Sequence, residues 1–341
     1  MKSLVGLFAL IIAFLTGATL ASCSVSRGGA NPCITNGPAE PSVAAAAGLE
    51  TLVFWDDFAN PATIDGGNTQ APGFNWYGSW TKRAGGKKIL VSSANYSVSN
   101  SILHLNSETD AGGYALQTWA ATGWAPNTFV GRSFAPPLYY EAKIAVNKSL
   151  APGSVGPGQD GNPSRFSWPT IWLQDITLMS AILSGGSISQ SYGEIDVLEF
   201  YVGTTGMGAR VWDQQANVHI WNSTTTISPD STNHVNWGTT WDDRTFHTVG
   251  VLVTSASAKF YFDGTLMQTI SLAGGMAPAF NSSYVLLINP GYGTWPTHVD
   301  YVGLWQHREA QRGVPLGVAN VCTSGSCCDN GEWGPPSDRL G

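Results

Sequence analysis

The stretch Lys259-Phe260-Tyr261-Phe262-Asp263-Gly264 decides the fold class of this chain. Strand-forming residues lead directly into Asp-Gly, which is a strong signal for a two-residue hairpin turn. The run Phe246–Val253 just before it has the composition of a second strand, and similar runs occupy residues 102–105, 139–144, 284–288 and 299–305. No convincing helix of more than two turns is found. The pattern therefore predicts an all-β fold built as a two-sheet antiparallel β-sandwich.

The composition restricts the class of partner. Among 341 residues, charged side chains make up 11%, against roughly 25% in an average soluble domain. Lys and Arg total 16 against 23 Asp and Glu, giving a net charge of −7. These cations are too few to build the basic face of a nucleic-acid-binding protein. With 40 Gly, 14 Trp and 11 Tyr, the chain suits short strands, many turns and an uncharged, sugar-like partner.

Residues 1–22 have the pattern of a signal peptide. Lys2 precedes the apolar run 4–15, which at about 12 residues is shorter than the roughly 20 that span a bilayer. Leu20-Ala21-Ser22-Cys23 resembles a lipobox, in which Cys23 would carry a lipid; ordinary cleavage after Ala21 is the alternative. We expect a secreted or cell-surface protein whose only membrane contact is a lipid anchor at Cys23.

The rest of the chain divides into three parts. Residues 23–48 are predicted to be a flexible tether, residues 49–307 one folded domain, and residues 308–341 a cysteine-containing tail. The five cysteines are Cys23, Cys33, Cys322, Cys327 and Cys328. Lipidation of Cys23 would leave four, and because sequence neighbours rarely bridge each other, either remaining pairing ties Cys33 to the tail. A zinc site is the weaker alternative, since no His or Cys-x-x-Cys spacing accompanies them.

Three acids stand close together in Gly193-Glu194-Ile195-Asp196-Val197-Leu198-Glu199-Phe200. The apolar residues between them predict a strand, on which Glu194 and Asp196 share a face. Glu199 lies at an odd offset and would point to the other face of an unbroken strand. A β-bulge near Val197-Leu198 would return it to the acidic face.

Carboxyl groups held this close raise one another's pKa, so one stays protonated while another is ionised. Cleavage of a glycosidic bond with retention needs such a pair, ~5–5.5 Å apart. The Cα atoms of Glu194 and Glu199 would lie ~13 Å apart, so both side chains must lean together across Asp196. A solvated acidic face and a calcium site are the alternatives. The many nearby aromatic residues, which can stack on sugars, favour the catalytic interpretation.

The segment Glu194-Ile195-Asp196-Val197-Leu198-Glu199 resembles the signature of glycoside hydrolase family 16, in the bulged Glu-x-Asp-x-x-Glu form of laminarinases, agarases and carrageenases. Five further segments resemble family elements in the same order, and the resemblance spans about residues 52–306. These segments are Tyr140–Lys143, Trp168–Trp172, Thr245–Thr248, Phe260–Gly264 and Val299–Val302.

The resemblance implies a concanavalin-like jelly roll with a sugar cleft. It implies Glu194 as the nucleophile, Glu199 as the acid/base and Asp196 as the helper beside the nucleophile. Three further residues are candidates for lining the cleft: Trp168, Trp172 and His219. For His219 a packed strand histidine is an equal alternative. No cofactor or catalytic metal is required.

Some relatives hold a structural calcium ion at positions that match Asp57 and Asp300. Surface or capping roles are the alternative for both acids.

We therefore expect an exported, monomeric, retaining endo-glycosidase that acts on a β-linked polysaccharide, either β-1,3-glucan or a red-algal galactan. A non-catalytic carbohydrate-binding sandwich and a transglycosylase remain alternatives. The segments Ala151–Pro163, Val251–Val253 and Asn289–Pro296 depart from the family pattern and leave the polysaccharide open.

Overall fold

The computed structural model describes residues 37–78, 91, 95–105, 116–121, 129–146, 170–176, 192–201, 213–221, 245–289 and 297–307. The predicted signal peptide, all five cysteines, Trp168 and the C-terminal tail lie outside the described residues. Within the described part of the chain, no helix combines the length and apolar character needed to cross a membrane.

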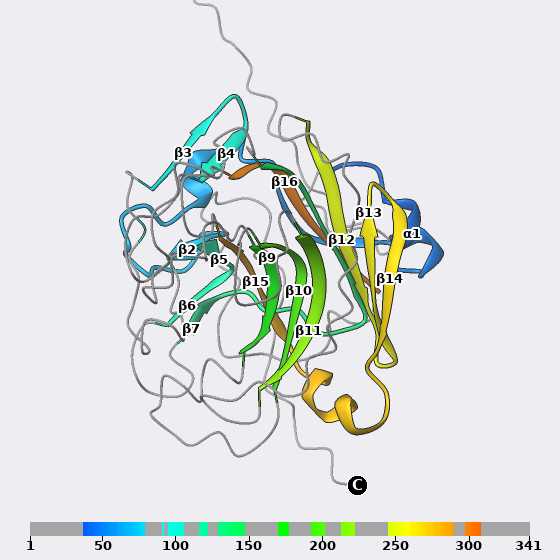
Figure 1. Cartoon of the computed structure of the whole chain (residues 1–341). Coiled ribbons are helices and arrows are strands. Elements are labelled where there is room, and N and C mark those ends of the chain that lie inside the picture. The colour runs from blue at the N-terminus through cyan, green and yellow to red at the C-terminus, as the bar shows by residue number, and fades with distance from the viewer. Residues whose placement is uncertain are drawn as a thin grey trace, which may run out of the picture.

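Two antiparallel sheets pack face to face (Figure 1). The larger sheet has eight strands, and β1 (Thr51–Asp56) joins it by pairing with β16. Its remaining strands, in spatial order, are β14 (Thr265–Ser271), β13 (Ser257–Phe262), β12 (His247–Val253), β8 (Leu138–Val146), β16 (Thr297–Gln306), β4 (Ile102–Leu105) and β3 (Tyr96–Ser99).

The smaller sheet has six strands. In spatial order they are β11 (Asp213–Trp221), β10 (Tyr192–Tyr201), β9 (Thr170–Asp175), β15 (Tyr284–Asn289), β5 (Leu116–Gln117) and β2 (Tyr77–Gly78). A separate hairpin pairs β6 (Trp119–Ala121) with β7 (Phe129–Gly131). The chain passes repeatedly from one sheet to the other, as in a jelly roll. The predicted all-β, two-sheet antiparallel sandwich is confirmed.

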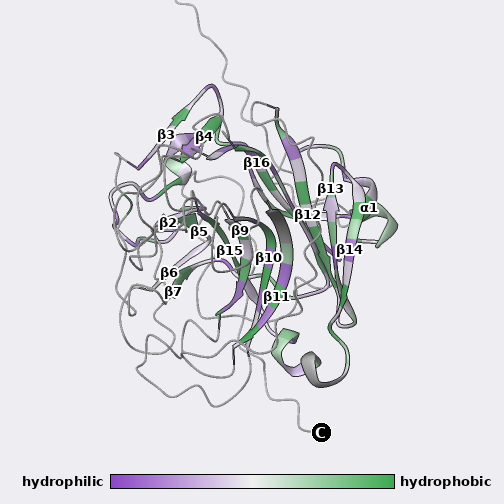
Figure 2. Ribbon diagram, viewed as in Figure 1, coloured by the Kyte–Doolittle hydropathy of each residue, from purple (hydrophilic) through white to green (hydrophobic). Residues whose placement is uncertain are grey.

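The core lies between the two sheets, where alternate residues of each strand meet. Leu103 and Ile144 enter it from the larger sheet, and Ile195, Val218 and Leu286 from the smaller one. Figure 2 shows hydrophobic residues recurring along the strands of both sheets. This alternation leaves the intervening polar residues on the two outer faces.

The predicted hairpin is present between β13 and β14. Asp263 and Gly264 have φ angles of 46° and 74°, the left-handed pair that a type I′ turn requires. The Asp263 carboxylate also fixes the neighbouring strand, because its Oδ1 accepts a hydrogen bond from the Thr248 amide at 2.9 Å.

Three short helical segments are described: α1 (Ser42–Ala46), η1 (Pro61–Thr63) and η2 (Gly274–Phe280). Helix α1 corrects the predicted tether, whose last residues are folded. Ala44 is fully buried and clusters with Leu49, Tyr139 and Trp305. The small side chains of α1 allow one helical turn to lie close against these aromatic rings. The composition of this segment, taken alone, is typical of a coil. The folded domain therefore begins before Leu49.

Candidate active site

The acidic segment forms β10, and its pairing with β9 contains an irregularity. Asp196 pairs with Trp172, but the next partners are Leu198 with Ile171, so Val197 is an extra residue. Pairing with β11 shifts at the same place, between Asp196 and Glu199. The predicted bulge at Val197-Leu198 is thus present.

The bulge sets the direction of the side chains. Val197 and Leu198 are consecutive, yet both are fully buried in the core between the sheets. Glu199 is therefore returned to the outer face of the smaller sheet, which Glu194 and Asp196 also occupy. Asp196 and Glu199 are covered on that face, with exposures of 2% and 4%.

Neighbouring strands surround the three acids with polar and aromatic side chains. Glu194 pairs with Gln174 on β9 and with His219 on β11. Asp196 pairs with Trp172 and Asn217.

Gly193 fits here because a Cβ would lie 2.6 Å from the Phe280 ring and 2.7 Å from the Ala279 carbonyl oxygen. Segment η2 therefore packs directly on the strand beside Glu194.

The hydrogen bonds to Glu194 are asymmetric. Trp221 Nε1 donates to Oε2 at 3.0 Å, and Gln174 Nε2 donates to the same oxygen at 3.3 Å. Among the described residues, none donates to Oε1. One oxygen of Glu194 is thus held by two neutral donors from the neighbouring strands β9 and β11.

The pKa of Glu194 is raised to about 8. Burial is the largest cause, followed by the negative charge of Asp196, and Glu199 adds to the rise. The charge of His219 and the Trp221 hydrogen bond oppose it. Because like charges crowd this face, the acidic cluster retains at least one proton at neutral pH.

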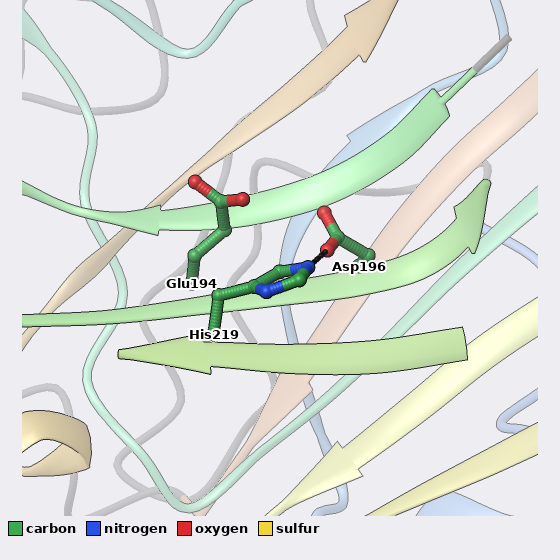
Figure 3. Close-up of side chains that lie close together, drawn as sticks. All are labelled: Glu194, Asp196 and His219. Atoms are coloured by element: carbon green, nitrogen blue, oxygen red, sulfur yellow. Dashed lines mark ion pairs between the residues drawn. The ribbon is translucent and has the colours of Figure 1, made fainter. Parts of the chain in front are cut away.

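His219 and Asp196 form an ion pair, with 2.9 Å between His219 Nε2 and Asp196 Oδ2. Figure 3 shows both side chains and Glu194 rising from the same face of two adjacent strands. One ligand atom from each of these three residues lies within 4.8 Å of the others. An imidazole with two carboxylates could hold a divalent cation, but the His219 contact also holds the Asp196 carboxylate in place without one.

The other predicted site residues are placed as follows. Trp172 lies on the outer face, half-buried, and donates from Nε1 to Asn289 Oδ1 at 2.6 Å. Asp57 Oδ1 accepts from the Ala59 amide at 3.1 Å, and Asp300 forms an ion pair with Lys143 at 2.7 Å. These are the capping and surface roles given above as the alternative to calcium, and calcium binding at these two acids remains a prediction.

Of the two donors to Glu194, Gln174 was not predicted from the sequence, and Trp221 was counted only among the nearby aromatic residues that can stack on sugars. A signal for them existed. Gln174 is two residues beyond Trp172, and Trp221 two residues beyond His219, so strand alternation places each on the face of its predicted neighbour.

No protein-family model and no curated protein matches this chain. Solved structures resemble it distantly. The endo-β-1,3-glucanase from Pyrococcus furiosus is 17% identical with a TM-score of 0.48, over 75% of this chain and 94% of that one. The laminarinase catalytic domain from Thermotoga maritima MSB8 is 16% identical with a TM-score of 0.46, over 75% and 98%. The β-agarase B from Zobellia galactanivorans is 14% identical with a TM-score of 0.40, over 62% and 78%.

Proposed function

We propose that this chain is a retaining endo-glycosidase of the glycoside hydrolase family 16 type, acting on a β-linked polysaccharide. The observation that carries the proposal is the bulge in β10, which brings Glu199 to the face occupied by Glu194 and Asp196. A binding surface does not need a kinked strand that aligns three carboxyl groups, whereas double displacement needs two of them side by side.

Glu194 is the nucleophile in this proposal. Trp221 and Gln174 bond to its Oε2, which orients the carboxylate and leaves Oε1 for attack on the anomeric carbon. Attack forms the bond between Oε1 and the sugar as the bond to the leaving oxygen breaks. Asp196, held by His219, keeps a negative charge beside the oxocarbenium-like transition state.

Glu199 is the acid and then the base. It gives its proton to the leaving oxygen, and later takes one from the water that hydrolyses the glycosyl-enzyme. The raised pKa of Glu194 is caused mainly by burial and by the charge of Asp196, and the charge of Glu199 adds to it. When Glu199 carries its proton, its charge no longer raises the pKa of Glu194, which then ionises more readily as the nucleophile.

The aromatic ring of Trp172 supports a sugar substrate, because it lies directly beside Asp196 on the outer face. The scarcity of cations argues against a heavily sulfated polymer. We propose β-1,3-glucan or a red-algal galactan as the substrate. The N-terminal pattern supports an exported chain, either free or lipid-anchored at Cys23, and we propose a monomer that needs no cofactor.

The test measures reducing ends and product sizes after incubation with laminarin, lichenan, agar, porphyran and carrageenan. We expect the wild-type chain to release internal fragments from at least one polymer. Glu194→Gln and Glu199→Gln should each lower that rate by ~10³-fold or more. The matched control Asp57→Asn changes an acid outside this sheet face and should keep wild-type rates. Cleavage of none of the polymers, or unchanged rates in both glutamine variants, would refute the proposal.

A further inference from the structure

The outer face of the larger sheet carries a pair of histidines. His104 on β4 lies directly opposite His298 on β16 in the antiparallel pairing. Their neighbours Leu103, Leu105 and Val299 enter the core, so both imidazoles point outward. This face is on the opposite side of the sandwich from Glu194, and the pair takes no part in the proposed hydrolysis.

The two rings meet through their Nδ1 atoms, which lie 2.8 Å apart. The ring planes are inclined at 75°, with centroids 4.8 Å apart. Two imidazole nitrogens at this distance share a single proton, and removing it leaves two lone pairs directed at the same small region.

Ser99 adds a second feature of a ligand site. Its Oγ lies 2.9 Å from Nε2 of His104, on the far side of the ring. When Nε2–H donates to this oxygen, the neutral His104 ring carries its lone pair on Nδ1, toward His298. Histidines that bind metals are commonly oriented by such a hydrogen bond from the other ring nitrogen.

We propose that His104 and His298 together bind one first-row transition-metal ion, such as Cu²⁺, Ni²⁺ or Zn²⁺, through their Nδ1 atoms. Two nitrogens each ~2.0–2.1 Å from one ion lie ~2.8–3.4 Å apart for square-planar or tetrahedral angles. The separation of 2.8 Å present here is at the short end of that range. Binding releases the shared proton, and water completes the coordination. Within the described part of the chain no carboxylate forms a three-residue cluster with this pair, so the site disfavours Ca²⁺ and Mg²⁺.

The site has a structural consequence. His104 belongs to the β3–β4 hairpin at the edge of the larger sheet, and His298 to β16, which also pairs with β8 and β1. An ion bound to both would tie this edge to the centre of the sheet. Because the unfolded chain lacks the arrangement, binding should raise the Tm.

The experiment is calorimetric titration of the full chain with Cu²⁺ and Ni²⁺, with Mg²⁺ as the comparison ion. His104→Gln and His298→Gln should each bind one equivalent fewer than the wild type and lose the metal-dependent rise in Tm. Ser99→Ala keeps both imidazoles and should weaken binding about tenfold. His307→Gln removes an unrelated histidine and should bind as the wild type does. Glu194→Gln should still bind the metal ion at His104 and His298. This result would distinguish binding there from binding at the acidic cluster.

A spectroscopic measurement covers the case in which a glutamine variant fails to fold. Electron paramagnetic resonance of the wild type with one equivalent of Cu²⁺ should show coupling to two nitrogens. Equal stoichiometry in the wild type and both histidine variants, or a Cu²⁺ spectrum without nitrogen coupling, would overturn the proposal.

Discussion

At the scale of single residues, Glu194 sets a pH dependence of stability. Its pKa is 4.5 as a free group and about 8 in the fold. Below pH 4.5 the group is protonated in both states. Between pH 4.5 and 8, Glu194 is ionised in the unfolded chain but stays protonated in the folded chain, where burial disfavours its charge. The free energy of unfolding therefore falls as pH rises through this range.

Glu194→Gln removes that cost and should be more stable than the wild type at pH 8 by ~1–3 kcal/mol. The difference should shrink toward pH 4.5. Urea unfolding of both chains at the two pH values measures it. A difference that is the same at both pH values would show that the carboxyl is not strained by burial.

Trp221 influences the pKa of Glu194, because its Nε1 donates a hydrogen bond to the carboxylate. Trp221→Phe removes the Nε1 donor to Oε2, and a hydrogen bond to a charged group contributes ~1.5–3 kcal/mol, so kcat/KM should fall ~10–100-fold. In the wild type this hydrogen bond lowers the pKa of Glu194, so its loss should raise that pKa in the variant. The acidic limb of the pH–rate profile should therefore move to higher pH. A lower rate with an unmoved limb would mean that Trp221 acts on substrate alone.

Among the secondary-structure elements, η2 supports β10, the strand that carries the three acids, through a direct contact. Gly193→Ala would place a methyl group against the Phe280 ring and the Ala279 carbonyl, and should destabilise the fold by ~1–3 kcal/mol. Gly67→Ala is the control, since its Cβ would meet only a Thr69 methyl group at 3.3 Å. Denaturant midpoints compare the two, and equal losses would argue against a close approach at Gly193.

Features that depend on residues close together in the sequence, such as the bulge and the hairpin, could be predicted from the sequence. The bulge was predictable because Glu199 is an odd number of residues from Glu194, and the hairpin because Asp263-Gly264 favours left-handed φ angles. The donors to Glu194 and the His104–His298 pair depend on which strands become neighbours. His104 and His298 are 194 positions apart, and nothing in the local pattern states that they meet.

For the whole molecule, the folded domain begins before residue 49, where the sequence composition had placed its start. Helix α1 covers Tyr139 and Trp305 on the outer face of the larger sheet. A chain starting at residue 49 should therefore be less stable than one starting at residue 37, by ~1–3 kcal/mol of lost apolar burial. Urea unfolding of the two chains tests this, and equal stability would restore the tether to its predicted end at residue 48.

The two outer faces of the sandwich carry separate chemistry in this account, with carboxyl groups on the smaller sheet and an imidazole pair on the larger one. On the smaller sheet, we propose that Glu194 and Glu199 act together to cleave one glycosidic bond with retention. This proposal is tested most directly by proton NMR of the reducing end formed in the first minutes of cleavage of a polymer that the wild type degrades. If the mechanism is retaining, the β anomer appears first and the α anomer grows later by mutarotation. Initial formation of the α anomer would show inversion and would refute the proposed double displacement.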